Sequence, residues 1–192
     1  MKERRLDFFA ELERYPKTER FLRFMEFRLA PVTAGVKPAE LITLCAGGGY
    51  TPYELWTREG PGLIEKQGLE FRYLRNKDEC ACIIAFRRAI LQDALVEEEA
   101  AKELATAGYE RGWNLEQNID ELASRFETSC PHESGLFLGI PSRDVRTFIE
   151  QKGKNYLFEG YWKVYHNPER AKRTFHLWDE ERNRIARLTT AS

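Results

Sequence analysis

The sequence lacks the apolar segments that would direct a chain to a membrane or across one. Residues 1–7 carry charge, but Glu11, Glu13 and Arg14 follow too soon for the hydrophobic core of a signal peptide. The longest stretch without a charged residue, 41–53, has 13 residues and contains three glycines and a proline. A membrane-spanning helix needs about 20 apolar residues. We therefore expect no signal peptide and no membrane partner.

The chain also lacks an excess of charge of either sign. Thirty Lys and Arg residues stand against 31 Asp and Glu residues, which leaves a formal net charge of −1. Such a balance gives no overall positive field to attract a nucleic acid. The most basic segment is the expected final helix, whose cations are most simply explained as a solvated face. These cations are Arg170, Lys172, Arg173, Arg182, Arg184 and Arg187. We expect no nucleic-acid partner.

Cysteine is scarce, with four residues: Cys45, Cys80, Cys82 and Cys130. Because no export signal accompanies them, we expect reduced thiols in a cytoplasmic protein rather than a disulfide framework. The Cys80-Ala81-Cys82 sequence lacks the paired knuckles of a structural zinc site. Its two thiols are therefore expected to be small buried hydrophobic groups.

The remaining composition is that of one ordinary globular domain. The 192 residues are 42% hydrophobic and 32% charged. A chain of this length and composition can bury a sizeable core without disulfide bonds or metal ions to hold it together. The sequence shows no internal repeat, linker or low-complexity segment. We expect a single domain over residues 1–192.

The first half of the chain predicts helices followed by a β-hairpin. Residues 1–30 have helical spacing of apolar side chains, with a break at Pro16. Residues 41–45 form a short apolar run that predicts a buried strand. Two further expected strands, 69–74 and 80–86, are separated by a polar turn and should pair as an antiparallel hairpin.

The middle of the chain predicts helices with an acidic surface. Residues 88–107 should form a helix in two pieces, ended by Gly108. Asn114 and Gln117 have the spacing of a capping box at the start of the next helix. Residues 93–127 include ten acidic and three basic side chains, and a solvated face is the simplest explanation of that imbalance.

The last third predicts a strand, a short helix, a second strand and a long helix. The strands are expected at 132–140 and 156–165, with a helix from Pro141 to Gly153 between them. Asn167 and the proline after it should cap the final helix. The pattern resembles a βαβ unit, whereas the helices elsewhere favour α+β. We expect a mixed α/β (α+β) domain whose central sheet has about five strands packed with helices.

Several phrases together resemble a bacterial family known as domain of unknown function 3793. They are Pro-His-Glu-Ser-Gly-Leu-Phe-Leu-Gly-Ile-Pro at 131–141, Gly-Tyr-Trp-Lys-Val-Tyr at 160–165, and Ala-Pro-Val-Thr-Ala-Gly-Val-Lys-Pro-Ala-Glu-Leu at 30–41. Most of the resemblance lies in a C-terminal signature region, 129–188. The resemblance brings no activity with it. Ser134 and Ile140 depart from the family pattern.

The segment from Tyr161 to Tyr165 carries the first group of candidate site residues. In a regular strand, Tyr161, Lys163 and Tyr165 share one face, and Trp162 and Val164 share the other. A lysine between two phenols could bind an anion, and partial burial would make its amine a nucleophile or a base. The alternative is that Lys163 and the phenols are ordinary outward-facing groups.

A second group lies at the start of the 132–140 segment, where a loop meets regular structure. His132 could act as a general base or a metal ligand, with Cys130 two residues away. Glu133 is a further candidate ligand-binding residue. The ordinary alternative is a histidine bonded to a backbone carbonyl. Glycines in this segment, such as Gly139, suggest the close approach of a ligand or another backbone.

Two loop lysines complete the candidate site. Lys37 follows a glycine and precedes a proline, and Lys154 follows the helix that ends at Gly153. With His132 and Lys163 they would form a cationic pocket suited to a carboxylate or phosphate. Residues 46–50 form a glycine-rich loop before an expected helix, with a capping-box pattern at Thr51. That loop could bind an anion, although a simple surface loop is the better explanation.

The leading hypothesis is that a small anionic metabolite or cofactor binds between the Lys37, His132 and Lys163 segments. Whether the protein is an enzyme stays open at this point. In an enzyme, His132 would carry a proton, Lys163 would stabilise charge, and Tyr161 or Tyr165 would orient the substrate. One alternative is metal, iron or haem handling through His132, Cys130 and either His166 or His176. Another is an adaptor that works through protein contacts. We predict no particular metal site.

Overall fold

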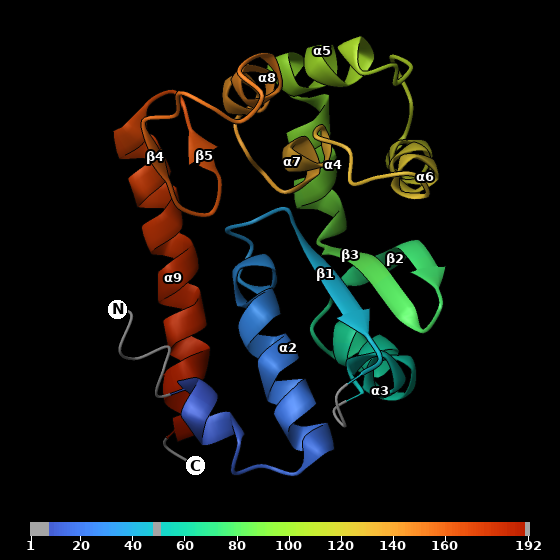
Figure 1. Ribbon diagram of the computed structural model, residues 1–192, viewed down its shortest axis with the longest axis vertical. Coiled ribbons are helices and arrows are strands. Elements are labelled where there is room, and N and C mark those ends of the chain that lie inside the picture. Colours follow the sequence, from blue (N-terminus) through green and yellow to red (C-terminus); the bar gives the residue numbers. More distant parts are fainter. Residues whose placement is uncertain (1–7, 48–50, 191–192) are drawn as a thin grey trace.

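The computed structural model describes residues 8–47 and 51–190. Residues 8–12 are helical, and the elements that follow are shown in Figure 1. In chain order they are α2 (Lys17–Thr33), β1 (Ala39–Cys45), α3 (Pro52–Lys66), β2 (Glu70–Lys77), β3 (Cys80–Phe86), α4 (Arg88–Val96), α5 (Glu98–Thr106), α6 (Leu115–Phe126), α7 (Ser134–Phe137), α8 (Ser142–Glu150), β4 (Phe158–Glu159), β5 (Lys163–Val164) and α9 (Pro168–Thr190).

The main sheet is antiparallel and has the strand order β1-β3-β2. The expected hairpin is confirmed, because β2 and β3 are adjacent along the chain and paired. The central strand β3 is buried from Ala81 to Phe86, and its continuous run of apolar residues is what a strand covered on both faces requires.

Two hydrophobic cores lie on opposite faces of this sheet. On one face, Ile42, Leu44 and Ile83 pack with side chains from α2 and α3. On the other face, Ile84 and Phe86 pack with side chains from α4, α6 and α7. Adjacent residues of one strand therefore belong to different cores, as the alternation of side chains along a strand dictates.

The C-terminal helix α9 returns the end of the chain to its beginning. It lies beside α2 in Figure 1, and the hairpin β4–β5 packs against its first half. Trp162 and Val164 of the hairpin region form a small core with Ala171 and Trp178 of α9. The α2–α9 pair and the start of β1 create the setting for the site described below.

The prediction of a strand at 132–140 is wrong. His132 and Glu133 lie in a turn, α7 occupies the middle of the segment, and Gly139 has a φ of +80°. Every residue from Glu133 to Phe137 is buried. A short apolar run that is buried all round has no periodicity to distinguish a strand from a helix, which is why the sequence pattern misled.

The expected strand at 156–165 is reduced to a minimal hairpin. Only Phe158–Glu159 and Lys163–Val164 pair, and a turn at Gly160, whose N–H donates to the carbonyl of Trp162 at 3.0 Å, separates them. The prediction of one sheet of about five strands is therefore wrong: the described residues form a three-stranded and a two-stranded sheet. The βαβ interpretation is wrong as well, and the mixed α+β class is confirmed.

Local helix signals were reliable in most places. Residues 88–107 form two helices, α4 and α5, as expected. Asn114 accepts from the Gln117 N–H at 2.9 Å, and the Gln117 side chain accepts from the Asn114 N–H, so the capping box forms. Thr51 does precede α3, but its side chain makes no capping hydrogen bond. The glycine-rich loop falls partly on residues 48–50, which lie outside the described residues.

The cysteines differ from the expectation of four reduced thiols. Cys45 of β1 and Cys80 of β3 are direct partners in the strand register and are joined as a disulfide. The sequence offered no sign of this pairing, because it depends on the alignment of two strands 35 residues apart. Cys82 is a buried free thiol, as expected, and Cys130 is an exposed one.

Candidate functional site

The most unusual polar group in the fold is the carboxylate of Glu40, the second residue of β1. Glu40 is in phase with Ile42 and Leu44, so its side chain points to a buried face, and it is only 5% exposed. Three cations surround it. Lys37 Nζ lies 2.6 Å from Glu40 Oε2, and Arg28 Nη2 lies 2.7 Å from Oε1. Arg182 Nη2 lies 3.3 Å from Oε2.

Distant parts of the chain deliver these cations. Arg28 comes from α2, Lys37 from the loop before β1, and Arg182 from α9, 142 residues after Glu40. The loop is held tightly, because the N–H groups of Val36 and Lys37 both donate to the carbonyl of Pro31, at 3.0 and 3.1 Å. The side chain of Lys37 therefore starts from a fixed backbone.

The cluster carries more positive charge than its own carboxylate balances. Among the described residues, Glu40 is the only carboxylate in ion-pair distance of Arg28, Lys37 or Arg182. The Lys37 and Arg182 side chains are 7% and 6% exposed, whereas that of Arg28 is 34% exposed. The Nε atoms of Arg28 and Arg182 are both buried without a hydrogen-bond partner in the described part of the chain. Buried charged groups are normally paired, so this surplus is exceptional.

The pKa values in the cluster reflect burial and mutual attraction. The pKa of Lys37 is lowered, first by burial and then by the charges of Arg182 and Arg28, which together outweigh the raising effect of the adjacent Glu40 carboxylate. Burial opposes the ionisation of Glu40, but Lys37, Arg28 and Arg182 together outweigh burial and lower the pKa of that carboxyl. Glu40 is therefore held as a carboxylate.

A pocket of about 430 Å³ opens beside this cluster. We call it the Lys37 pocket. Its walls are aromatic and aliphatic: Lys37 Nζ lies 4.5 Å from the centre of the Trp178 ring, and the Arg182 guanidinium lies 4.8 Å from that of Tyr161. The other lining residues are Phe9, Phe27, Leu41, Leu138, Ile140 and Trp162. An apolar pocket with a few convergent charged groups is the usual form of a small-molecule site.

A second pocket of about 310 Å³ adjoins the first, and we call it the His132 pocket. His132, Lys163 and Cys130 line it. The two pockets share four lining residues: Leu138, Ile140, Tyr161 and Trp162. Lys163 Nζ donates to the carbonyl of Gly153 at 2.9 Å, and the edge of the His132 ring meets Phe148, with the ring centres 5.2 Å apart.

The structure therefore brings some of the sequence-predicted residues together and separates others. His132 and Lys163 share one pocket, Lys37 lines the next, and Tyr161 lines both. Tyr161 donates its hydroxyl to Asp179.

The other three candidates line neither pocket. Glu133 is paired with Arg125 at 3.1 Å, and Lys154 is exposed. Tyr165 is 8% exposed, and its hydroxyl has no hydrogen-bond partner among the residues described. Tyr165 thus differs from the outward-facing phenol that one alternative expected.

The three histidines lie apart. His166 Nε2 is 2.9 Å from the Thr147 hydroxyl, and His176 pairs with Glu180 on α9 at 3.3 Å. Within 8–47 and 51–190, no group of three or more His, Cys, Asp or Glu side chains is arranged to hold a metal ion. The described helices also include none that combines the length and apolar character of a membrane span.

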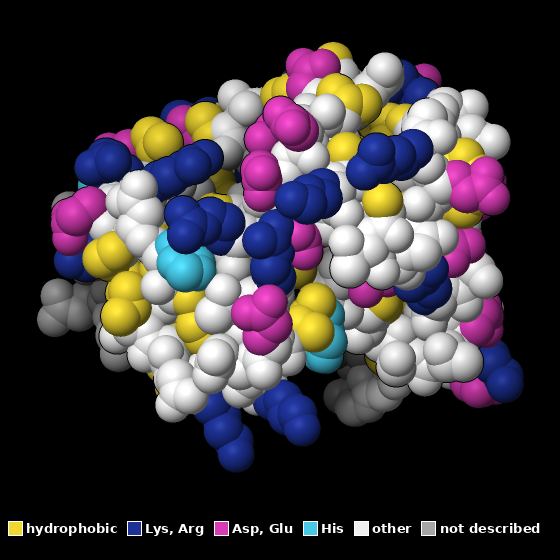
Figure 2. Space-filling view, turned by 90° about the horizontal axis from the view of Figure 1, so that it is seen from above, with side chains coloured by type: hydrophobic (Ala, Val, Ile, Leu, Met, Phe, Trp, Pro, Cys, Tyr) yellow, Lys and Arg dark blue, Asp and Glu magenta, His cyan; other side chains and the backbone are white. Residues whose placement is uncertain are grey.

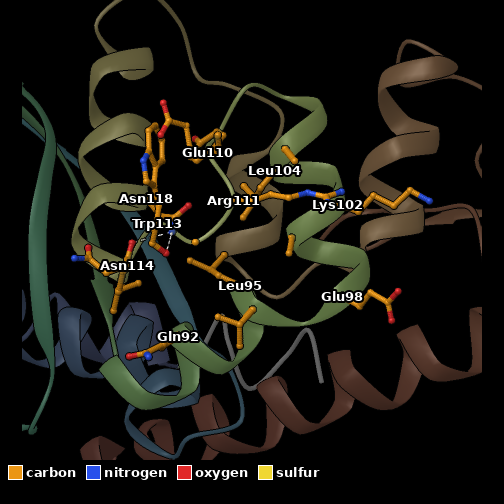
Figure 3. A pocket seen from close by; sticks show the side chains of 16 residues that line it. Gln92, Leu95, Glu98, Lys102, Leu104, Glu110, Arg111, Trp113, Asn114 and Asn118 are labelled. Atoms are coloured by element: carbon orange, nitrogen blue, oxygen red, sulfur yellow. Dashed lines mark hydrogen bonds between the residues drawn. The ribbon is translucent and has the colours of Figure 1, made fainter.

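A third hollow of about 450 Å³ lies between α4, α5 and α6 (Figure 3). Its lining includes two acidic and two basic side chains: Glu98, Glu110, Lys102 and Arg111. The side-chain amide of Asn118 donates hydrogen bonds to the carbonyls of Trp113 and Asn114, at 3.2 and 2.8 Å. The charges that line this hollow are thus balanced, unlike those of the Lys37 pocket.

The adaptor hypothesis called for a large exposed apolar patch. In the view from above in Figure 2, hydrophobic side chains lie in small groups separated by charged side chains of both signs. Among the exposed large apolar residues of the described chain, Val96 and Leu157 are the most exposed, at 66% and 62%. They belong to the α4–α5 junction and to the segment before β4.

Sequence reasoning missed three of the four residues of the charged cluster: Arg28, Glu40 and Arg182. A signal for two of them was present. Glu40 is in phase with the apolar residues of its strand, and Arg182 lies four residues after Trp178, on the apolar stripe of α9. A charged side chain on the same face of a strand or helix as the apolar residues indicates a buried partner rather than a solvated face.

Taken together, the fold and the site define an α+β protein with a buried, cation-rich pocket between its first long helix and its last. The model of one protein family, described as protein of unknown function (DUF3793), matches residues 25–192. The chain therefore belongs to this family, as the resemblance of its motifs suggested. No curated protein and no solved structure matches it.

Proposed function

We propose that this protein binds a small molecule with a carboxylate or phosphate group in the Lys37 pocket. The observation that carries the proposal is the surplus of cations: Arg28, Lys37 and Arg182 share Glu40 alone among the described carboxylates. A bound oxyanion would offset this surplus positive charge and accept hydrogen bonds from the guanidinium groups. Such charge-assisted bonds are the strong ones, and guanidinium groups suit planar oxyanions.

Energetics favour this explanation over a purely structural cluster. Taking a charge out of water costs free energy, and each buried charge beyond a matched pair adds to that cost. Here three cations share Glu40 alone among the described carboxylates. Lys37 and Arg182 are almost fully buried, so water offers them little compensation. A ligand that binds the folded state supplies the missing negative charge.

The shape of the pocket supports a small organic anion. Its volume of about 430 Å³ falls within the range of about 300–1,000 Å³ typical of small-molecule sites. Arg28, the most exposed of the three cations, lies where an incoming anion would first meet charge. Tyr161 and Trp178 supply apolar surface for the rest of the molecule.

The proposal narrows the sequence-based hypothesis. Lys37 remains a ligand-binding residue, joined by Arg28 and Arg182. His132 and Lys163 line the adjoining pocket, so their roles as proton carrier and charge stabiliser remain predictions. His132 and Lys163 would take these roles only toward a ligand long enough to extend from the Lys37 pocket into the His132 pocket. Such a ligand would lie along Tyr161 and Trp162, which line both pockets.

The test is anion-dependent stabilisation of the purified protein. Thermal unfolding would be followed with phosphate, succinate and pyruvate at constant ionic strength, in the wild type and in Arg182→Gln. Arg184→Gln is the matched control, because Arg184 lies on the same helix and is 48% exposed. Ligand binding to the folded state raises its stability with concentration.

We expect at least one anion to stabilise the wild type and the control equally. In Arg182→Gln its affinity should fall at least tenfold, since a hydrogen bond to a charged group contributes about 1.5–3 kcal/mol. Circular dichroism would confirm that the variant is folded. No response to any anion, or equal responses in all three proteins, would overturn the proposal.

A location in the bacterial cytoplasm is part of the same proposal. The sequence favoured the cytoplasm because the four cysteines were expected to be reduced. The Cys45–Cys80 disulfide removes that support for a cytoplasmic location, because disulfides are rare in the cytoplasm. Cell fractionation with an antibody to the protein would test the location. Recovery outside the cytoplasmic fraction would refute it.

A further inference from the structure

The chemistry of Lys37 extends beyond attraction to an anion. Its ammonium is buried beside Glu40, faces the ring of Trp178 and lines the pocket together with Arg28 and Arg182. A desolvated lysine next to other cations is the environment in which an amine becomes a nucleophile toward carbonyl groups. We propose that Lys37 forms an imine with the ketone of a 2-oxo acid whose carboxylate binds the arginines; this proposal rests on the proposed anion site.

The arrangement of charges allows Lys37 to lose its proton. Glu40 would be left unpaired if Lys37 were its sole partner, but Arg28 holds Oε1 at 2.7 Å and Arg182 lies 3.3 Å from Oε2. The carboxylate therefore stays compensated when the amine becomes neutral. Deprotonation also reduces the surplus of buried positive charge, and the lowered pKa of Lys37, caused first by burial, agrees with this.

The positions of the groups match a carboxylate next to a ketone. Lys37 Nζ and Arg182 Nη2 both approach the same oxygen, Glu40 Oε2. An anion held by Arg182 thus lies beside the Lys37 amine. In a 2-oxo acid the reacting carbon is bonded directly to the carboxylate carbon. Binding the carboxylate therefore brings the ketone to the nucleophile, which is the contribution of proximity to catalysis.

The reaction balances with Lys37, Glu40 and the ligand alone. The lone pair of Lys37 Nζ forms a bond to the carbonyl carbon, and the carbonyl electron pair moves to its oxygen, which takes the first of the two nitrogen protons to become a hydroxyl. Glu40, 2.6 Å from Nζ, is placed to remove a proton from the nitrogen and to return it to the hydroxyl. The hydroxyl leaves as water while the carbon–nitrogen double bond forms. Amine and oxo acid become imine and water, without oxidation or reduction.

Lys163 provides a contrast within the same region. The sequence predicted a nucleophilic or basic lysine at Lys163, yet its Nζ donates to the carbonyl of Gly153 at 2.9 Å and lies 4.9 Å from the Tyr156 ring. No carboxylate pairs with it among the described residues, so it lacks an adjacent proton acceptor such as Glu40. For this reason we propose the imine at Lys37, and the role predicted for Lys163 stays a prediction.

Reductive trapping tests the inference. The protein would be incubated with pyruvate and sodium cyanoborohydride, which reduces an imine to a stable secondary amine, and modified lysines would be located by peptide mass spectrometry. Lactate, which has the carboxylate but no ketone, would be titrated separately to measure anion binding. Lys154, an exposed lysine, is the internal control for unselective labelling.

We expect Lys37 to be modified at least tenfold faster than Lys154, and excess lactate to slow its labelling. Lys37→Arg should lose this adduct, whereas anion binding is measured separately by the lactate titration of the wild type. If lactate binds but Lys37 is labelled no faster than Lys154, the imine proposal is overturned and the anion site stands. If neither acid binds and Lys37 is not labelled, both proposals fail for this class of ligand.

Discussion

Trp178 and Val36, which are 142 residues apart, are joined by a hydrogen bond: the indole N–H of Trp178 donates to the carbonyl of Val36 at 3.0 Å. Val36 precedes Lys37 in the loop before β1, and Trp178 lies one helical turn before Arg182 on α9. This bond therefore links the two segments that carry Lys37 and Arg182. The Lys37 pocket depends on how the first and last parts of the chain dock.

Replacing Trp178 with phenylalanine should loosen this docking. The variant keeps an aromatic ring, but it leaves the carbonyl of Val36 without its donor. We expect the free energy of unfolding to fall by about 1–3 kcal/mol, measured by urea denaturation, and anion affinity to fall with it. Trp113→Phe is the control, since Trp113 is only partly buried. Equal losses in the two variants would show that the Val36 bond has no special role.

Gly139 should tolerate no side chain. Its φ of +80° disfavours other residues, and a Cβ there would lie 2.8 Å from Pro38 Cδ. We expect Gly139→Ala to lower the unfolding free energy by about 2–4 kcal/mol. Gly112→Ala separates the two causes, because Gly112 has a φ of +89° but open space around it. Its loss should be about 1–2 kcal/mol, and a loss as large as that of Gly139→Ala would refute the contact with Pro38.

Asp144 of α8 should be essential for holding the β4–β5 hairpin. Its carboxylate is 2% exposed and accepts hydrogen bonds from Trp162 Nε1 at 2.8 Å and from the N–H groups of Tyr165 and His166, at 3.2 and 2.9 Å. Asn at this position keeps the shape but has one acceptor oxygen fewer. Asp144→Asn should therefore destabilise the fold by about 2–4 kcal/mol in thermal or chemical denaturation. The neighbouring Arg143→Gln, at an exposed position, should change stability by less than about 0.5 kcal/mol.

The stability contributed by Glu40 should depend on pH in a defined direction. Lys37, Arg28 and Arg182 outweigh burial and lower the pKa of Glu40 below its ordinary value of 4.5. The folded state then binds fewer protons than the unfolded state between the two pKa values, so stability rises with pH across that interval. The contribution is fully present above about pH 5 and is lost as the pH falls through the folded-state pKa.

The comparison of wild type with Glu40→Gln isolates this effect. At pH 7 the variant should be less stable by about 3–5 kcal/mol, because removing one partner leaves buried charges uncompensated. The difference should shrink as the pH is lowered below 4.5. Glu65→Gln, on an exposed position of α3, is the reference for general acid effects. A difference that stays constant from pH 7 to pH 3 would contradict the electrostatic role of Glu40.

The parts of the fold that the sequence predicted well are those with local chemical signals. Asn114 and Gln117 form their capping box, and the apolar run of β3 became a strand buried on both faces. The segment 132–140 was predicted wrongly because its middle, residues 133–137, is buried by tertiary contacts on all sides, so that no period appears in the sequence. The number of strands in one sheet was likewise decided by Gly160, where the chain turns instead of extending.

The candidate site was predicted only in part for a different physical reason. Lys37 was chosen because it lies in an irregular loop, and the structure gives it a buried position in a pocket. Arg182 was assigned to a solvated face because its helix is basic as a whole. Its place four residues after Trp178 was a local signal of burial, but its pairing with Glu40 depends on the contact between α9 and the start of β1. Pairings between residues 142 positions apart become visible only in three dimensions.

Crystallography with selenate, an oxyanion whose selenium scatters anomalously, would show whether an anion balances the charge of the Lys37 pocket. We expect an anomalous peak in this pocket, with selenate oxygens in hydrogen-bond distance of the Arg28 and Arg182 guanidinium groups, and its loss in Arg182→Gln. A pocket without an anomalous peak at saturating selenate would contradict the proposed anion site.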